Sequence, residues 1–92
     1  MIIERRRVTY AGRVQGVGFR MTARRLSSGF TVSGYVRNQE DGGVELVVEG
    51  EPDVVASYLK AIHREFGNMI RDIREEPEQT GGESLAGFTI RY

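Results

Sequence analysis

The alternation of apolar and polar side chains predicts where the strands of this chain lie. Val8 and Tyr10 alternate with polar neighbours, which predicts a half-exposed strand within residues 5–14. Residues 31–38 are rich in Val, Thr and Tyr, and residues 44–49 continue the alternation, so both segments predict strands. An Asp-Gly-Gly turn separates the two segments, and such turns favour a β-hairpin.

Helical spacing predicts two helices. Residues 19–28 form the first, with Met21 and Leu26 available for the core and Gly29 as its stop. Pro52 suits the first turn of the second helix, because its missing N–H is not needed there. The apolar positions of the second helix fall on one stripe: Val54, Val55, Tyr58, Leu59, Ile62 and Phe66.

The remaining segments complete a recognisable order of elements. Residues 69–75 predict a fourth strand, residues 76–87 a polar loop, and alternating Phe88, Ile90 and Tyr92 a terminal strand. The order is βαββαβ plus a short terminal strand. It predicts an α+β fold of the ferredoxin-like split βαβ type, an antiparallel sheet with two helices on one face.

Composition limits the chemistry. We expect the 92 residues to form one domain over positions 1–92. There are no cysteines, which excludes disulfides, thiolate nucleophiles and cysteine-based zinc sites. His63 is the only histidine, and we interpret it as a surface or half-buried helix residue. No Asp/Glu cluster has metal-ligand spacing, so we expect no metal and no cofactor.

The distribution of apolar and charged residues also bears on location and partners. No segment approaches the roughly 18 apolar residues of a membrane span, and residues 1–7 lack the order of a secretory signal. We therefore expect a cytoplasmic protein without a membrane partner.

The net charge is zero, but residues 1–37 carry +7 and residues 38–92 carry −7. The excess of arginine in the N-terminal part either reflects an uneven distribution of surface charge or serves to bind an anion. The neutral total and the lack of stacking aromatics argue against nucleic acid.

The segment Gly12–Arg20 carries the strongest chemical signal. Its sequence, GRVQGVGFR, joins a strand to a helix. Glycines allow backbone N–H groups to turn inward, and a helix start adds unpaired N–H groups, so a phosphate would fit here. Arg20 could grip two phosphate oxygens with its planar fork. Asn38 ends the second strand and could contact both a water and a phosphate oxygen. A tight turn with a surface arginine, and a turn asparagine, remain the structural alternatives.

Three segments together resemble the acylphosphatase family. They are GRVQGVGFR at Gly12–Arg20, GYVRN at Gly34–Asn38 with a following Asp-Gly and Val-Glu, and FTIRY at residues 88–92. Length and motif order are similar to those of the free-standing, single-domain members. The resemblance implies that Arg20 binds the phosphoryl group and that Asn38 positions the attacking water. It also implies that the phosphate contacts the backbone amides of Gln15, Gly16, Val17, Gly18 and Phe19.

The implied activity is metal-independent hydrolysis of acyl phosphates. The leaving carboxylate has a conjugate acid of pKa about 4, so it needs little help from a general acid, and charge stabilisation does most of the work. We expect a monomer whose partners are a small acyl phosphate and inorganic phosphate, the latter as product and inhibitor. The alternative is a non-catalytic anion-binding module of the same fold. An RNA-binding domain is disfavoured because the strand at residues 44–49 has no aromatic residue.

Overall fold

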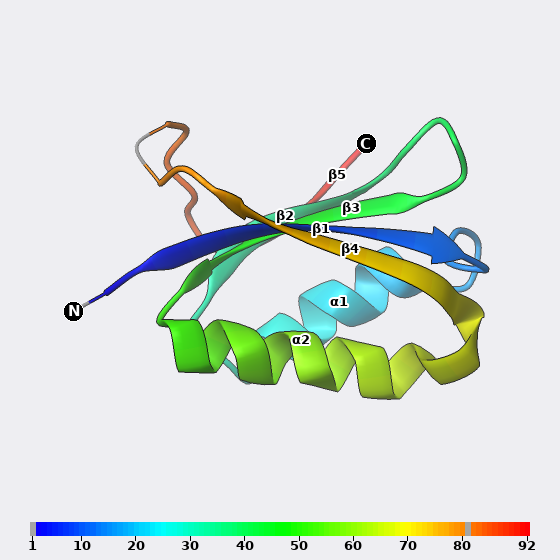
Figure 1. Ribbon diagram of the computed structural model, residues 1–92, viewed down its shortest axis with the longest axis horizontal. Helices are drawn as coiled ribbons and strands as arrows, with labels where there is room; N and C mark the ends of the chain where they lie inside the picture. The colour runs from blue at the N-terminus through cyan, green and yellow to red at the C-terminus, as the bar shows by residue number, and fades with distance from the viewer. Residues whose placement is uncertain (1, 81) are drawn as a thin grey trace.

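A twisted sheet lies on one side of the molecule and two helices lie on the other (Figure 1). The computed structural model describes residues 2–80 and 82–92. The elements, in chain order, are β1 (Glu4–Gly12), α1 (Phe19–Ser27), β2 (Ser33–Asn38), β3 (Val44–Gly50), α2 (Pro52–Phe66), a 3₁₀ turn (Gly67–Met69), β4 (Ile70–Glu78) and β5 (Phe88–Arg91). The predicted α+β fold with two helices on one face is confirmed.

The strands are arranged in the order β4-β1-β3-β2-β5. The first four are antiparallel, as predicted, and Val8 faces Leu46 of β3 on one side and Glu75 of β4 on the other. The terminal strand β5 pairs parallel to β2, so the sheet is mixed rather than wholly antiparallel. The parallel pairing follows from the directions of the strands. Strands β1 and β2 run in the same direction and β4 runs in the opposite one. Because the chain reverses after β4, β5 runs parallel to β2.

The core fills the space between the sheet and the helices. The α1 helix contributes Phe19, Ala23 and Ser27 at four-residue spacing, and α2 buries most of the predicted stripe. The two helices are tied together by the Tyr58 hydroxyl, which donates to the Ala23 carbonyl at 2.8 Å. Met21 was expected to be available for the core, but it is 68% exposed because it lies off the α1 face that these residues occupy.

The fourth strand is longer than its sequence pattern predicts. Residues 76–78, expected to begin a loop, continue β4 and pair with Arg7, Arg6 and Arg5 in turn. Pro77 is tolerated because β4 is an edge strand, where a missing N–H need not break a ladder. These three arginines lie on an interior strand, where acidic neighbours offset their charge.

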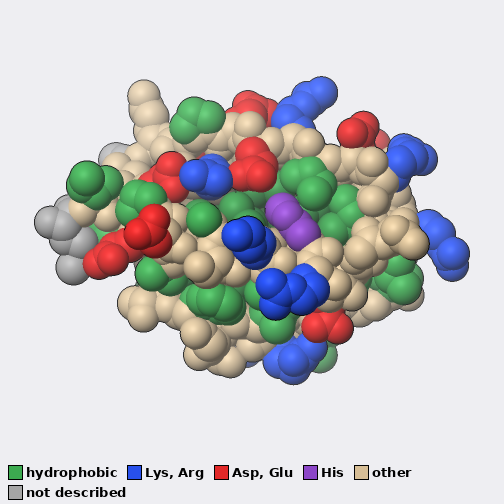
Figure 2. All heavy atoms as spheres, turned by 60° about the horizontal axis from the view of Figure 1, so that its bottom comes forward, with side chains coloured by type: hydrophobic (Ala, Val, Ile, Leu, Met, Phe, Trp, Pro, Cys, Tyr) green, Lys and Arg blue, Asp and Glu red, His purple; other side chains and the backbone are tan. Residues whose placement is uncertain are grey.

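The outer face of the two helices is charged. Arg24 on α1 and Lys60 and Arg64 on α2 are exposed, and Figure 2 shows basic side chains beside the single histidine on this side. The longest described helix, α2, has 15 residues. No described helix has both the length and the apolar character needed to cross a bilayer.

Candidate anion site at the start of the first helix

The segment between β1 and α1, residues 13–18, ends in a turn at residues 15–18 that is held by buried anchors on either side. Gly16 and Gly18 have φ values of 76° and 77°, which side-chain-bearing residues adopt only with strain. Val14 before the turn is 1% exposed and Phe19 after it is 2% exposed. Val17 packs partly against the same core. The glycines therefore bend the backbone while apolar side chains on both sides hold it in place.

The start of α1 is open to an anion. Gly18 is the N-cap and offers no side-chain cap, and no acidic residue lies in the first turn. The first helical bond runs from the Thr22 amide to the Gly18 carbonyl at 2.9 Å. Within the described residues, no amide from Gln15 to Phe19 donates a well-formed backbone hydrogen bond outside the regular elements. Together with the positive end of the helix dipole, these amides favour a phosphate-sized anion.

Arg20 lies in the first turn of this helix and adds a positive charge to the amides. None of the ion pairs found among the described residues uses it. Its guanidinium carbon lies 4.9 Å from the centre of the Tyr92 ring, a ring that is itself 99% exposed. The contact with Tyr92 leaves the N–H groups of the fork available for ligand oxygens, because a cation–π contact uses the face of the guanidinium.

Asn38 is the last residue of β2 and faces Val44 across the hairpin. Its Oδ1 is buried, and no donor among the described residues reaches it. A buried acceptor without a donor costs about 1–3 kcal/mol, so this oxygen gains from any ligand that donates to it. The backbone beside it is paired across the hairpin neck, where the Gln39 amide donates to the Gly43 carbonyl at 2.8 Å.

The side chain of Gln15 joins the glycine turn to this hairpin. From the sequence, only the backbone amide of this residue was expected to have a role. Gln15 Nε2 donates to the carbonyl oxygens of Gln39 and Gly43, each at 2.8 Å. The turn and the hairpin tip lie at the same end of the molecule (Figure 1). Arg20 and Asn38 thus belong to two segments that Gln15 fastens together. A glutamine in a turn gives no sequence signal for so distant a partner.

His63 contacts the core below the turn, not the turn itself. Its Nε2 lies 3.0 Å from the hydroxyl of the fully buried Tyr10, whose ring packs 5.0 Å from that of Phe19. Burial lowers the pKa of His63, although the carboxylate of Glu75 acts in the opposite direction. Burial also raises the pKa of Tyr10, so its hydroxyl stays protonated. The pair supports the packing beneath the site and agrees with the half-buried position expected for His63.

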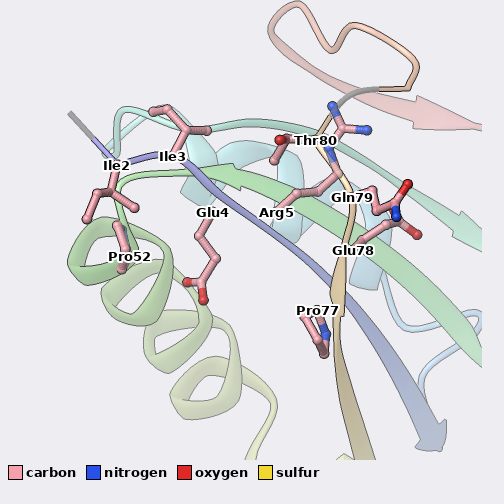
Figure 3. Close-up of a pocket in the computed structure, with 9 residues that line it drawn as sticks. All are labelled: Ile2, Ile3, Glu4, Arg5, Pro52, Pro77, Glu78, Gln79 and Thr80. Carbon is pink, nitrogen blue, oxygen red and sulfur yellow. The ribbon is translucent and has the colours of Figure 1, made fainter.

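A surface hollow lies elsewhere and is drawn in Figure 3. It surrounds the start of β1, at the opposite end of that strand from the glycine turn, and is lined by Ile2, Ile3, Glu4, Arg5, Pro52, Pro77, Glu78, Gln79 and Thr80. Arg5 in the wall of the hollow forms an ion pair with Glu49 at 2.8 Å. The carboxylates of Glu4 and Glu78 disfavour the binding of an anion there. Across the part of the chain that the structure describes, no three side chains are grouped to ligate a metal.

Comparison with known proteins identifies the family to which this arrangement belongs. The sequence model of the family described as Acylphosphatase matches residues 6–90. A curated acylphosphatase from Caldivirga maquilingensis is 42% identical over 87 residues, 94% of this chain and 92% of that protein. One from Salinibacter ruber is 50% identical over 80 residues, 87% of this chain and 84% of that protein.

A solved structure supports the same assignment. The crystal structure of acylphosphatase from Bacillus subtilis superposes with a TM-score of 0.86 at 29% identity, covering 99% of this chain and 100% of that one. The sequence match and the shared fold both extend over nearly the whole chain, and the glycine turn and Asn38 lie within the matched residues. The chain therefore belongs to the acylphosphatase family of hydrolases.

Proposed function

We propose that this enzyme hydrolyses acyl phosphates to a carboxylate and inorganic phosphate without a metal ion, at the start of α1. The observation that carries the proposal is the uncapped helix start, where the amides of residues 15–19 and the guanidinium of Arg20 are available together. These groups supply the charge and hydrogen bonds that a phosphoryl group needs as charge spreads over its oxygens. The family assignment supports the same chemistry.

Each group has a separate role in the proposed reaction. The amides of Gln15, Gly16, Val17, Gly18 and Phe19 hold the phosphoryl oxygens, and Arg20 grips them through its fork. Asn38 orients the water that attacks phosphorus while the bond from phosphorus to the acyl oxygen breaks. The electron pair of that bond leaves with the carboxylate.

The buried oxygen of Asn38 supports its proposed role. Oδ1 lacks a donor among the described residues, and a water would satisfy it. Because this oxygen is closed off in the resting arrangement, meeting a water requires the amide to rotate about its Cβ–Cγ bond. That torsion is soft for asparagine, so the rotation costs little. Asn38 can then accept from the water and donate to a phosphoryl oxygen.

A metal is unnecessary in this scheme because the leaving group is already good. The carboxylate's conjugate acid has a pKa of about 4, so the departing oxygen needs neither a general acid nor a Lewis acid. The positive charge of Arg20 and the helix dipole offset the charge on the phosphoryl oxygens. Inorganic phosphate, the product, should occupy the same amides and inhibit competitively. All the groups invoked come from one chain, so we expect a monomer to be active.

The test is phosphate release from benzoyl or acetyl phosphate by the purified protein, with and without a chelator. We expect equal rates in both conditions, competitive inhibition by phosphate, and loss of activity in Arg20→Ala. A matched control is Arg24→Ala, which removes an exposed arginine from the last turn of the same helix. Activity that requires added magnesium would overturn metal independence. Phosphate binding without turnover would instead favour the non-catalytic anion-binding module.

A further inference from the structure

The side chain of Gln15 makes two hydrogen bonds to a segment distant in sequence. Its Nε2 donates both protons, one to the Gln39 carbonyl and one to the Gly43 carbonyl, at 2.8 Å each. Carbonyl oxygens can only accept, so the orientation of the carboxamide is fixed with its nitrogen toward the hairpin. The partners lie 24 and 28 residues away along the chain.

Those two carbonyls close the neck of the β2–β3 hairpin. The Gly43 carbonyl also accepts from the Gln39 amide at 2.8 Å, and the Gln39 carbonyl accepts from the Gly42 amide at 3.2 Å. The Gly43 amide is held in turn by Asp41 Oδ1 at 2.9 Å. Gln15 therefore binds the hairpin at a rigid point, directly after Asn38.

The side-chain oxygen of Asn38 is not held by a comparable hydrogen bond. Because Oδ1 accepts no hydrogen bond from the described residues, that atom does not fix the position of the amide. The position must come from the backbone, which is held by the pairing with Val44 on one side and by Gln15 at the adjacent Gln39 carbonyl on the other. A shift of the Gln39 carbonyl moves Asn38 with it.

We propose that the Gln15 side chain is a positioning residue, which fixes Asn38 relative to the amides that hold the phosphoryl group. This inference rests on the proposed function and goes beyond the backbone-amide role assigned there to Gln15. Its side chain touches neither the phosphate nor the water in this scheme. It acts through Asn38, so its loss should slow the attack on phosphorus and leave phosphate binding intact.

The decisive test is a double-mutant cycle with Gln15→Met and Asn38→Ala. Methionine keeps the length and the backbone amide of residue 15 but removes both donors. We expect kcat to fall about 10- to 100-fold, the scale of a small misplacement of a reacting group, with the phosphate inhibition constant within about twofold of the parent's. In the Asn38→Ala background the same substitution should change kcat by less than about twofold.

Two controls make the cycle interpretable. Gln79→Met makes the same chemical change at an exposed position beside the distant hollow and should leave kcat unaltered. Gln15→Leu offers a second side chain of similar volume, and circular dichroism reports the folding of each variant. Loss of folded structure in both Gln15 variants would make the residue a structural one and overturn the proposal.

The outcomes separate this inference from the proposed function. If Asn38→Ala turns over like the parent, the assigned role of Asn38 fails and Gln15 fails with it. If Asn38→Ala is slow but Gln15→Met is not, only the present inference fails. Multiplicative losses in the double variant, or lost phosphate affinity with normal kcat, would show that Gln15 shapes the turn rather than placing Asn38.

Discussion

In the proposed reaction, the guanidinium of Arg20 and the amide of Asn38 act at different stages. Arg20 has a full charge and a planar fork beside free amides, so we expect it to contact phosphoryl oxygens before and during the reaction. Asn38 is neutral and its oxygen has no donor among the described residues, so we expect it to act on the water, which matters only as attack proceeds. Substitutions should therefore separate binding from turnover.

We predict that Arg20→Ala weakens phosphate binding and nearly abolishes turnover. Arg20→Lys should restore little, because an ammonium group cannot reproduce the fork. Asn38→Ala should bind phosphate almost normally and lose about 10²-fold in kcat, as when one oriented polar group is removed from a site. Calorimetric phosphate titration beside steady-state kinetics measures both effects. Equal loss of phosphate affinity in the two alanine variants contradicts the division of roles.

The partial burial of His63 makes stability depend on pH. Burial lowers the pKa of His63 below its usual value of 6.5, despite the opposing charge of Glu75. The unfolded chain therefore binds a proton more readily than the folded one. The stabilising contribution is complete above about pH 6.5 and is lost as the pH falls toward the lower pKa of the folded state.

We predict that the parent loses more stability between pH 7.5 and 5.5 than His63→Gln does. Glutamine can still accept from Tyr10 but does not titrate. Urea midpoints at the two pH values measure the difference. Titration of the carboxylates affects the stability of both proteins equally, so it cancels in the comparison. An identical loss in parent and variant would show that His63 contributes nothing to the pH dependence.

At the scale of elements, the glycine turn fixes how α1 begins. A Cβ on Gly18 would meet nothing within 4 Å, so the need for glycine lies in its backbone conformation rather than in crowding. Because this glycine N-cap has no side chain, it cannot cap the amides that follow it. Stability and anion binding therefore depend on the same residue.

We predict that Gly18→Ala lowers the free energy of unfolding by about 1–2 kcal/mol, the cost of a left-handed conformation for an L-residue. Weaker phosphate binding should accompany the loss. Gly29→Ala is the matched control, since its φ is not in the left-handed region and its Cβ would make only an ordinary contact at 3.6 Å. Urea unfolding measures both. A Gly18 variant as stable as the Gly29 variant would contradict the strain argument.

Elements with a clear period could be predicted from the sequence. The stripe on α2 was found because helical spacing depends only on local order, and most of its members are buried. The extension of β4 through residues 76–78 could not be predicted, because acidic residues and a proline take up strand structure only against the arginines of β1. The parallel pairing of β5 depends on the path of the whole chain.

The candidate site, too, has a part that could be predicted from the sequence and a part that could not. Consecutive residues such as Gly16, Gly18 and Arg20 could be assigned together because their chemistry is local. The hydrogen bonds from Gln15 to the hairpin, and the position of Arg20 over the Tyr92 ring, join distant segments, so they became visible only in three dimensions.

For the whole molecule, the fold offsets the uneven charge of the chain. Arg5 binds Glu49, Arg6 binds Glu75, and Arg7 lies 3.5 Å from Glu78. Much of the N-terminal excess of arginine is therefore directed at acidic strands rather than at an external polyanion. This arrangement supports our expectation that the protein binds no nucleic acid specifically.

We predict that Arg5→Met destabilises the protein by about 1.5–3 kcal/mol, the range for hydrogen bonds to charged groups. The Arg5 side chain is 6% exposed and also donates to the Glu83 carbonyl at 2.8 Å. Arg6→Met is the control, because Arg6 is 29% exposed and solvent screens its pairs. Urea midpoints measure the contrast. Equal effects of the two substitutions would show that burial of Arg5 adds nothing.

The position of β1 between β4 and β3 has a consequence for how fast the protein folds. Its contacts join residues 44 and 69 positions apart, whereas β2 and β3 meet through a short turn. Distant pairs form slowly because long loops must close first, while a hairpin forms within roughly 10 μs. A refolding chain should form the Asn38 hairpin early and dock the strand that leads into the glycine turn late. Hydrolytic activity should therefore return with the slowest refolding phase, well after helical circular dichroism begins to recover.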